Sequence, residues 1–168
     1  MSLKGRSALI TGSTQGLGLA MAERLASLGC NIVMNGLGDA AVIEGRCLAL
    51  EKAHGVRVFH SSADLGQPAQ IEAMVKEAEG IFESIDIMIN NAVVRHFAPV
   101  EKFNPADWDR ALAVNLSAAF HTVRLLLPGM RRRDFGRIVN ISSIYGLRAA
   151  VDRIDYVTTK TALLGFSR

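Results

Sequence analysis

Cysteine is scarce in this chain of 168 residues, which contains only Cys30 and Cys47. Neither thiol stands at a spacing typical of metal ligands, so we expect no metal site, and two isolated thiols suit the reducing cytoplasm. No basic segment followed by an apolar run precedes the first expected strand, so nothing indicates a secretory leader. Charged or polar residues interrupt every apolar run before it reaches the ~20 residues of a membrane-spanning helix, and we expect no membrane segment.

A large excess of charge of one sign is also missing, since the formal net charge is +3. The densest basic run, Arg131 to Arg133, is followed at once by Asp134. Cations are favourable at helix C-termini, so we interpret this run as a solvated helix end and expect no nucleic-acid partner. A hydrophobic content of 49% with 21% charged residues is typical of a globular domain with its own core.

Short apolar runs alternate with longer segments of helical periodicity along the chain. Strands separated by helices cannot form hairpins, so they should form a parallel sheet covered on both faces. Right-handed crossovers then predict a doubly wound, Rossmann-like α/β fold. We find no linker or repeat and expect one domain over residues 1–168, without a sixth strand after its last helix. The expected strands are 7–10, 31–34, 56–60, 85–89 and 137–141, and the expected helices are 16–28, 40–53, 67–82, 105–132 and one from about 153.

The first expected strand runs directly into a glycine-rich loop, residues 11–18, which reads Thr-Gly-Ser-Thr-Gln-Gly-Leu-Gly. The glycines at positions 12, 16 and 18 permit tight turns and let a phosphate approach the amide donors of a helix N-terminus. A glycine triplet alone also fits a plain strand-to-helix turn. Its place between a strand and a helix, at the start of a βαβ unit, favours a pyrophosphate cradle.

Three reactive side chains stand near the end of the chain: Ser143, then Tyr156, then Lys160. Residues four apart share one helix face, so the ammonium of Lys160 can lie beside the phenol of Tyr156. Each residue alone has an ordinary structural explanation, but their joint spacing favours a site that moves a proton beside a hydride. Ser142 is the alternative serine, and its spacing to Tyr156 disfavours it.

The order of these motifs is similar to that of the short-chain dehydrogenases/reductases. The chain presents Gly-x-x-x-Gly-x-Gly, then Asn90-Asn91-Ala92, then Asn115, and then the serine, tyrosine and lysine. The resemblance covers essentially the whole chain but only about the N-terminal two-thirds of a usual family member. Usual members continue through further strands and a substrate-covering loop, so we expect a C-terminally truncated dinucleotide-binding and catalytic domain.

The resemblance implies hydride transfer between a nicotinamide cofactor and a small secondary alcohol or ketone. Tyr156 would be the general acid/base, Ser143 would hold the substrate oxygen, and Asn115 would support a water relay to Lys160. Lys160 would also hydrogen-bond the nicotinamide ribose. A free phenol titrates near ~10, and the positive charge of Lys160 should favour the phenolate.

The resemblance also implies a set of cofactor contacts, with Asp64 and Leu65 beside the adenine. The end of the second strand, residues 35–39, offers no Arg or Lys for a 2′-phosphate, so NAD is favoured over NADP. Asp39 is interpreted as a helix cap. Val93 stands where the family usually has Gly, and we expect it either to crowd the cofactor or to require a different backbone angle. The expected cofactor contacts are Gly12, Thr14, Gln15, Gly16, Leu17, Gly18, Leu37, Asp64, Leu65, Asn91, Ala92, Tyr156 and Lys160.

Within that family, the segments 35–40, 54–58 and 116–121 look like those of D-3-hydroxybutyrate dehydrogenases. At the positions where that group recognises its carboxylate, this chain has Arg95, Tyr145 and Arg153. The group has a Gln, a His and a Lys there, so none of the three is identical. Arginine offers planar bidentate donors, so we expect a short hydroxy or keto acid, 3-hydroxybutyrate among them, and a changed substrate is an equal alternative. Equally good explanations are a solvent-facing loop charge for Arg95 and a first-turn helix residue for Arg153, and Tyr145 could simply pack. His96 is interpreted as a polar loop residue.

Two other functions stay open at this point. The chain could be a catalytically silent fragment that binds nucleotide or self-associates, or it could be a 3-oxoacyl reductase, although such enzymes usually use NADPH. The family resemblance also implies a homo-oligomer, a dimer or tetramer, packed through the helix at 105–132 and the helix that carries Tyr156.

Overall fold

The central strand of the sheet is β1 (Ser7–Ile10), and all four of its residues are buried. In the computed structural model, which describes residues 2–168, five parallel strands lie in the order β3-β2-β1-β4-β5. The other strands are β2 (Asn31–Asn35), β3 (Val58–Ser61), β4 (Ile87–Asn90) and β5 (Arg137–Asn140). The strand order reverses between β1 and β4, which creates the switch point where open α/β sheets bind ligands. The expected Rossmann-like fold is confirmed.

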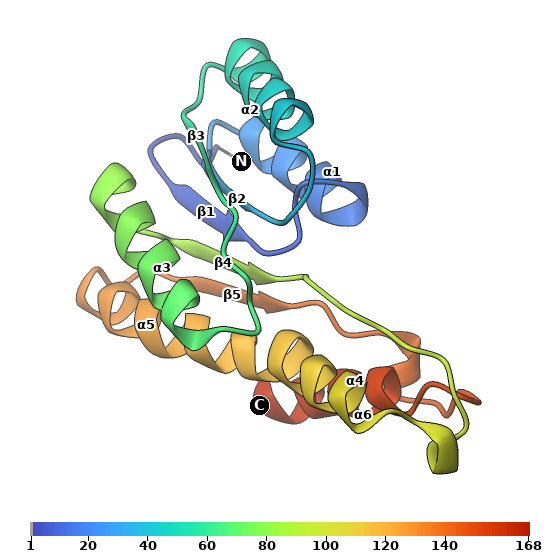
Figure 1. Ribbon diagram of the computed structural model, residues 1–168. Helices are drawn as coiled ribbons and strands as arrows, with labels where there is room; N and C mark the ends of the chain where they lie inside the picture. The colour runs from blue at the N-terminus through green and yellow to red at the C-terminus, as the bar shows by residue number, and fades with distance from the viewer. Residues whose placement is uncertain (1) are drawn as a thin grey trace.

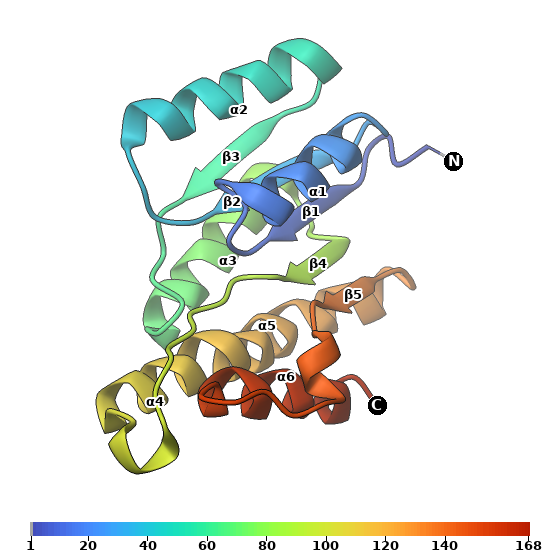
Figure 2. The same cartoon turned by 90° about the vertical axis from the view of Figure 1, so that its right-hand side faces the viewer.

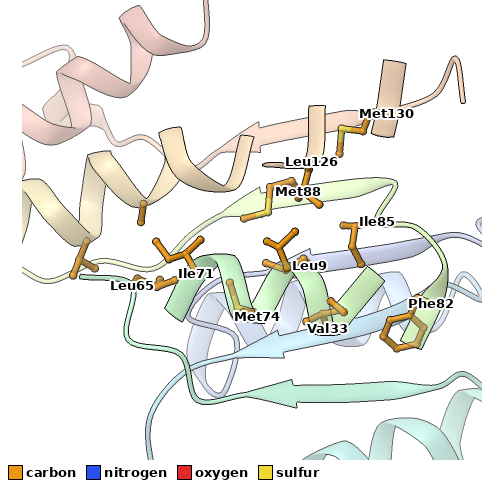
Figure 3. Packing of buried hydrophobic residues seen from close by; sticks show 14 residues of the cluster. Leu9, Val33, Leu65, Ile71, Met74, Phe82, Ile85, Met88, Leu126 and Met130 are labelled. Atoms are coloured by element: carbon orange, nitrogen blue, oxygen red, sulfur yellow. The ribbon is translucent and has the colours of Figure 1, made fainter. Parts of the chain in front are cut away.

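Helices cover both faces of this sheet (Figures 1 and 2). Successive residues of β1 point to opposite faces: Leu9 packs with α3 (Pro68–Phe82) and α5 (Ala118–Arg132), as Figure 3 shows. Ala8 and Ile10 pack with α1 (Gly16–Ala26) and α2 (Ala40–His54). Burial on both faces explains why the strands read as continuous apolar runs. The last helix, α6 (Ile154–Phe166), packs beside α4 (Pro105–Leu112).

Polar side chains cap the N-termini of α2 and α4, and a glycine ends α2. The carboxylate of Asp39 accepts a hydrogen bond from the backbone N–H of Val42 at 3.1 Å, so its interpretation as the cap of α2 is confirmed. Asn104 caps α4 in the same way, through the N–H of Ala106 at 3.0 Å. Gly55 ends α2 in the left-handed conformation, with φ +63°.

The expected helix at 105–132 is interrupted in its middle. A π-helical turn, Ala113–Ser117, joins α4 to α5, so the run contains one wide turn that periodicity did not predict. By length and composition this run could also span a membrane, so our expectation that no segment qualifies is wrong. Its packing against α3 and α6 accounts for its apolar residues as part of a domain core.

Candidate active site

The glycine loop lies against the segment that follows β4, and this contact requires glycine. A Cβ on Gly12, whose φ is +63°, would lie 2.9 Å from the Cα of Ala92. A Cβ on Gly18 would overlap the carbonyl oxygen of Gly12 and lie 2.7 Å from the Nδ2 of Asn91. No side chain fits at either position, so the loop packs directly against the segment that follows β4. The three glycines also line a cavity at the N-terminus of α1, where a pyrophosphate cradle is predicted.

Two side chains join the ends of β1 and β4 across the switch point. The Oγ1 of Thr11 accepts hydrogen bonds from the N–H groups of Asn91 and Ala92, at 2.9 and 3.1 Å. The Nδ2 of Asn91 donates to the carbonyl oxygens of Thr11 and Gly12, at 2.9 and 3.0 Å. These bonds satisfy buried backbone groups and fix one wall of the site.

A cavity of about 620 Å³ lies at these strand ends. Its lining combines the glycine loop with Leu37 after β2, Asp64 and Leu65 after β3, Asn91 and Ala92 after β4, and Tyr156 and Lys160 on α6. All thirteen residues expected to contact the cofactor therefore surround one cavity, although they come from distant parts of the sequence. Their individual roles stay predictions.

Asp64 is engaged in a way that the sequence does not indicate. Its two carboxylate oxygens pair with the guanidinium of Arg110 on α4, at 2.7 and 3.1 Å, and one also accepts from the N–H of Gly66 at 2.9 Å. The side-chain hydrogen bond from Arg110, aided by the Gly66 N–H, holds the pKa of this carboxyl below its usual value. Arg110 also lines the cavity, so an ion pair and not a lone carboxylate forms this wall.

Lys160 lies deep in the wall opposite the glycine loop and is only 3% exposed. Its Nζ donates to the carbonyl oxygen of Ile141 at 2.5 Å and lies 5.7 Å from the centroid of the Tyr156 ring. Burial lowers the pKa of this ammonium to about 8. The structure thus places a desolvated cation beside the phenol.

The two neighbouring serines differ in what their hydroxyls do. The Oγ of Ser142 donates to the carbonyl oxygen of Lys160 at 2.8 Å and so ties this loop to α6. The Oγ of Ser143 accepts from the N–H of Tyr145 at 3.2 Å. That bond leaves the hydroxyl proton of Ser143 free, whereas the proton of Ser142 is used in its bond to Lys160. Ser142 lines the 620 Å³ cavity, whereas Ser143 and Tyr145 are not in its lining, so the choice of Ser143 as the substrate serine stays a prediction. The Tyr145 ring meets the Tyr156 ring edge-on at 6.4 Å.

Asn115 occupies the π-helical turn and is buried. Its Oδ1 accepts from the N–H of Val94 at 2.8 Å, and its Nδ2 donates to the carbonyl oxygen of Val94 at 2.8 Å and to Thr159 Oγ1 at 3.3 Å. Among the described residues, Asn115 is not part of the cavity lining and makes no hydrogen bond to Lys160. Through these bonds Asn115 holds the segment after β4 against the π-helical turn and α6.

The two arginines expected to bind the substrate line different cavities. Arg95 is exposed and lines the cavity, whereas Arg153 stacks on the ring of Phe97 at 4.1 Å and faces the Tyr145 ring at 5.6 Å. Arg153 lines a different cavity, of about 420 Å³. Arg95 thus shares a cavity with Tyr156, whereas Arg153 meets Tyr145, whose ring contacts that of Tyr156.

Sequence reasoning missed two polar contacts near the site. Arg46 on α2 donates to the carbonyl oxygen of Thr14 and so links the glycine loop to α2. His96, interpreted as a polar loop residue, pairs with the buried carboxylate of Asp155. Both contacts join residues far apart in the sequence, so no local pattern marks them. Across residues 2–168, we find no cluster of three or more His, Cys, Asp or Glu side chains that could hold a metal ion.

The sequence matches the family described as short chain dehydrogenase over residues 6–168. It is 43% identical over 166 residues to a D-beta-hydroxybutyrate dehydrogenase from Cupriavidus necator, across 99% of this chain and 64% of that protein. A 3-oxoacyl acyl-carrier-protein reductase from Aquifex aeolicus is 35% identical, across 100% of this chain and 67% of its own length.

A solved structure of similar fold is the L-sorbose reductase from Gluconobacter frateurii, complexed with NADPH and L-sorbose. The TM-score is 0.94 at 32% sequence identity, across 99% of this chain and 63% of that one. The chain thus spans somewhat less than two-thirds of the length of the hydroxybutyrate dehydrogenase and of the sorbose reductase.

Proposed function

Because this chain belongs to the short-chain dehydrogenase family, we propose that it is an oxidoreductase for a short 3-hydroxy acid and its ketone, with Tyr156 as general acid/base. One observation carries the proposal. A single cavity is lined on one side by the glycine loop and on the other by Tyr156 and Lys160. A nucleotide cradle and a proton-transfer pair on one cavity are what hydride transfer to a carbonyl requires.

The cradle fits a nicotinamide dinucleotide, since Gly12, Gly16 and Gly18 line the cavity at the N-terminus of α1. The loop amides would hold the pyrophosphate, Leu65 would cover the adenine, and Asn91 would approach the second ribose. A bound dinucleotide supplies the carbon that accepts or donates hydride. We propose NAD rather than NADP, because Arg46 is committed to the Thr14 carbonyl and does not join the described cavity lining.

Proton transfer needs a phenol that can ionise near neutral pH. A free phenol titrates near ~10, and bringing it to neutrality requires about 4 kcal/mol of preference for the phenolate. The nearby ammonium of Lys160 supplies positive charge that favours the phenolate. This charge acts strongly on the phenol because Lys160 is buried. With a pKa of about 8, Lys160 is mostly charged at pH 7 and loses this effect as the pH rises through 8.

Substrate recognition is assigned to Arg95 and Ser143. Arg95 is exposed and lines the cavity, and a guanidinium binds a carboxylate through two parallel hydrogen bonds. Ser143 would donate its hydroxyl proton to the substrate oxygen. The relatives named D-beta-hydroxybutyrate dehydrogenases support a short 3-hydroxy acid as the substrate class.

A second candidate is a 3-oxoacyl reductase, which the Aquifex aeolicus relative favours. Such an enzyme would act on a thioester, which carries no carboxylate beside its ketone for Arg95 to bind. Turnover of 3-oxoacyl thioesters with NADPH, rather than of free acids with NAD, would therefore decide for this candidate.

We further propose that the protein is cytoplasmic. We also propose that it assembles as a homodimer or homotetramer through α5 and α6. Phe120, on α5, is 50% exposed and offers an apolar contact for a second copy. Light scattering on a size-exclusion column, comparing the chain with Phe120→Lys, tests the assembly.

The decisive test of the function is NADH formation with D-3-hydroxybutyrate and related acids. The 168-residue chain is assayed beside Tyr156→Phe and beside a version extended with the C-terminal third of the Cupriavidus necator relative. We expect turnover that Tyr156→Phe reduces by roughly 10²- to 10⁴-fold while NADH binding persists. Activity in the extended version alone would limit the chain to nucleotide binding, and inactivity in both would contradict the proposal.

A further inference from the structure

A buried carboxylate lies directly before Tyr156 on the first turn of α6. The side chain of Asp155 is 0% exposed, which for an acidic residue requires partners. Its Oδ2 accepts from the backbone N–H and the ring Nδ1 of His96, at 3.1 and 2.9 Å. Its Oδ1 accepts from the N–H of Tyr156 at 2.6 Å. One carboxylate therefore joins the backbone of Tyr156 to His96.

His96 receives contacts from two other elements. Its Nε2 lies 3.7 Å from the Oδ1 of Asp107 in the first turn of α4, and the Phe103 ring meets its imidazole edge-on at 6.2 Å. In the tautomer that carries its proton on Nδ1, the ring donates to the Oδ2 of Asp155. These contacts fix the orientation of the ring between α4 and α6.

The segment that contains His96 passes along the cavity. Val93, Val94 and Arg95 line it, and the next residues turn toward α6. Beyond His96, the Phe97 ring stacks on Arg153, and the N–H of Ala98 donates to the carbonyl oxygen of Asp152 at 3.2 Å. Of these three contacts with the start of α6, the one between His96 and Asp155 is central and involves a fully buried carboxylate.

We propose that Asp155 and His96 are positioning residues that fix Arg95 relative to Tyr156, and that they thereby select short hydroxy-acid anions. Asp155 sets the start of the helix that carries Tyr156, and through His96 it sets the segment that carries Arg95. A short hydroxy acid must meet both groups at once, its carboxylate at Arg95 and its oxygen at Tyr156. This inference rests on the proposed function, and it adds the pair of residues that sets the distance between the two groups.

The test compares Asp155→Asn with Asp107→Asn, which removes the weaker and more exposed carboxylate contact of His96. The introduced amide keeps the size of the side chain but has one acceptor oxygen in place of two, so it cannot accept from His96 and from Tyr156 together. We expect amide hydrogen exchange across residues 93–97 to accelerate in Asp155→Asn and to stay unchanged in Asp107→Asn. Nitrogen chemical shifts of the His96 ring should show a protonated Nδ1 in the wild-type chain and should change only in Asp155→Asn.

Kinetics supply a second readout. Asp155→Asn should raise KM for D-3-hydroxybutyrate by about tenfold or more, because a misplaced binding group weakens substrate positioning. KM for NAD, and the rate with a neutral secondary alcohol that Arg95 does not bind, should change little. His96→Asn, whose amide can donate where Nδ1 does, should retain a low KM that His96→Ala loses.

Equal effects of Asp155→Asn and Asp107→Asn on exchange and on KM would overturn the proposal. A loss of NAD binding parallel to the loss of acid binding would also overturn it, since it would show general destabilisation. If the wild-type chain proves inactive, the proposed function fails separately, and the exchange and ring-shift comparison still decides whether Asp155 holds the Arg95 segment.

Discussion

The glycine loop and the wall that carries Tyr156 face each other across one cavity, but they are built by different means. In the glycine loop, the close contact is between backbone atoms, which the absence of side chains at Gly12 and Gly18 permits, and the side chains of Asn91 and Arg46 add hydrogen bonds to it. In the opposite wall, side chains bind distant backbone groups, as Lys160 binds Ile141 and Asn115 binds Val94. The first kind of site depends on residue type and spacing, and the second depends on how the whole chain folds.

The two walls also differ in their surroundings. The loop follows β1, which is buried over its whole length between two other strands. The opposite wall includes the end of β5 at the sheet edge, where Val139 is 42% exposed. We therefore expect changes in the loop to act on fold and nucleotide binding together, and changes in the opposite wall to act more on chemistry and on local order.

The largest effect is expected at Gly18. A methyl group there overlaps the Gly12 carbonyl and approaches Asn91, so Gly18→Ala should lower the free energy of unfolding by about 3 kcal/mol and remove NADH binding. Urea unfolding and NADH fluorescence titration measure the two losses. The matched control is Gly45→Ala in α2, where a Cβ meets no atom within 4 Å and should stabilise the helix by about 1 kcal/mol. A stable, NADH-binding Gly18→Ala protein would refute the close packing of the loop.

Lys160 should make stability depend on pH in a distinctive direction. Its pKa is 10.5 when free and about 8 in the folded chain, so between these values the unfolded state binds more protons and stability rises with pH. Relative to Lys160→Met, the wild-type chain should gain about 3 kcal/mol of unfolding free energy from pH 7 to pH 10.5. Denaturation at several pH values checks this. A difference between the two proteins that does not vary with pH would contradict the burial of this ammonium.

Asn115 tests the side-chain contacts of the opposite wall. Asn115→Ala leaves the N–H and carbonyl oxygen of Val94 without their partner, which should cost about 2 kcal/mol of stability. Asn104→Ala, which removes only the exposed cap of α4, should cost about 1 kcal/mol. Urea unfolding of both variants gives the comparison, and an equal or smaller loss at Asn115 would count against its role in holding Val94.

The smallest effect is expected at Val93, which lines the cavity and is 39% exposed. If its branched side chain crowds the cofactor, Val93→Ala should tighten NADH binding by about threefold and leave stability nearly unchanged. Val100→Ala, an exposed control outside the described cavity lining, should change neither. Weaker binding after Val93→Ala would show that the side chain supports the cofactor instead.

The features that could be predicted from the sequence are those with local signals. Alternating apolar runs and helical periods predict the parallel sheet, and the spacing of Gly12, Gly16 and Gly18 predicts the cradle. Asp39 was identified as a cap because it directly precedes a helical period. The spacing from Tyr156 to Lys160 predicts that both lie on one face of one helix. In the structure the Nζ of Lys160 lies 5.7 Å from the centroid of the Tyr156 ring.

The remaining features arise from contacts between distant residues. The π-helical turn at Asn115 does not disturb the apolar pattern of 105–132 enough to be visible. The pairing of Asp64 with Arg110 spans 46 positions, and that of His96 with Asp155 spans 59. A single sequence carries no signal for such pairs, because their partners are set by the packing of α4 and α6 beside the sheet.

We expect this cavity to bring a nicotinamide carbon, a substrate carbon and the Tyr156 phenol together. The most direct measurement is deuterium transfer from deuterium-labelled NADH to acetoacetate, followed by mass spectrometry of the product. We expect 3-hydroxybutyrate with one deuterium at the former carbonyl carbon, formed by the wild-type chain and not by Tyr156→Phe. Tight NADH binding with no deuterium in the product, or equal transfer by both proteins, would contradict the account.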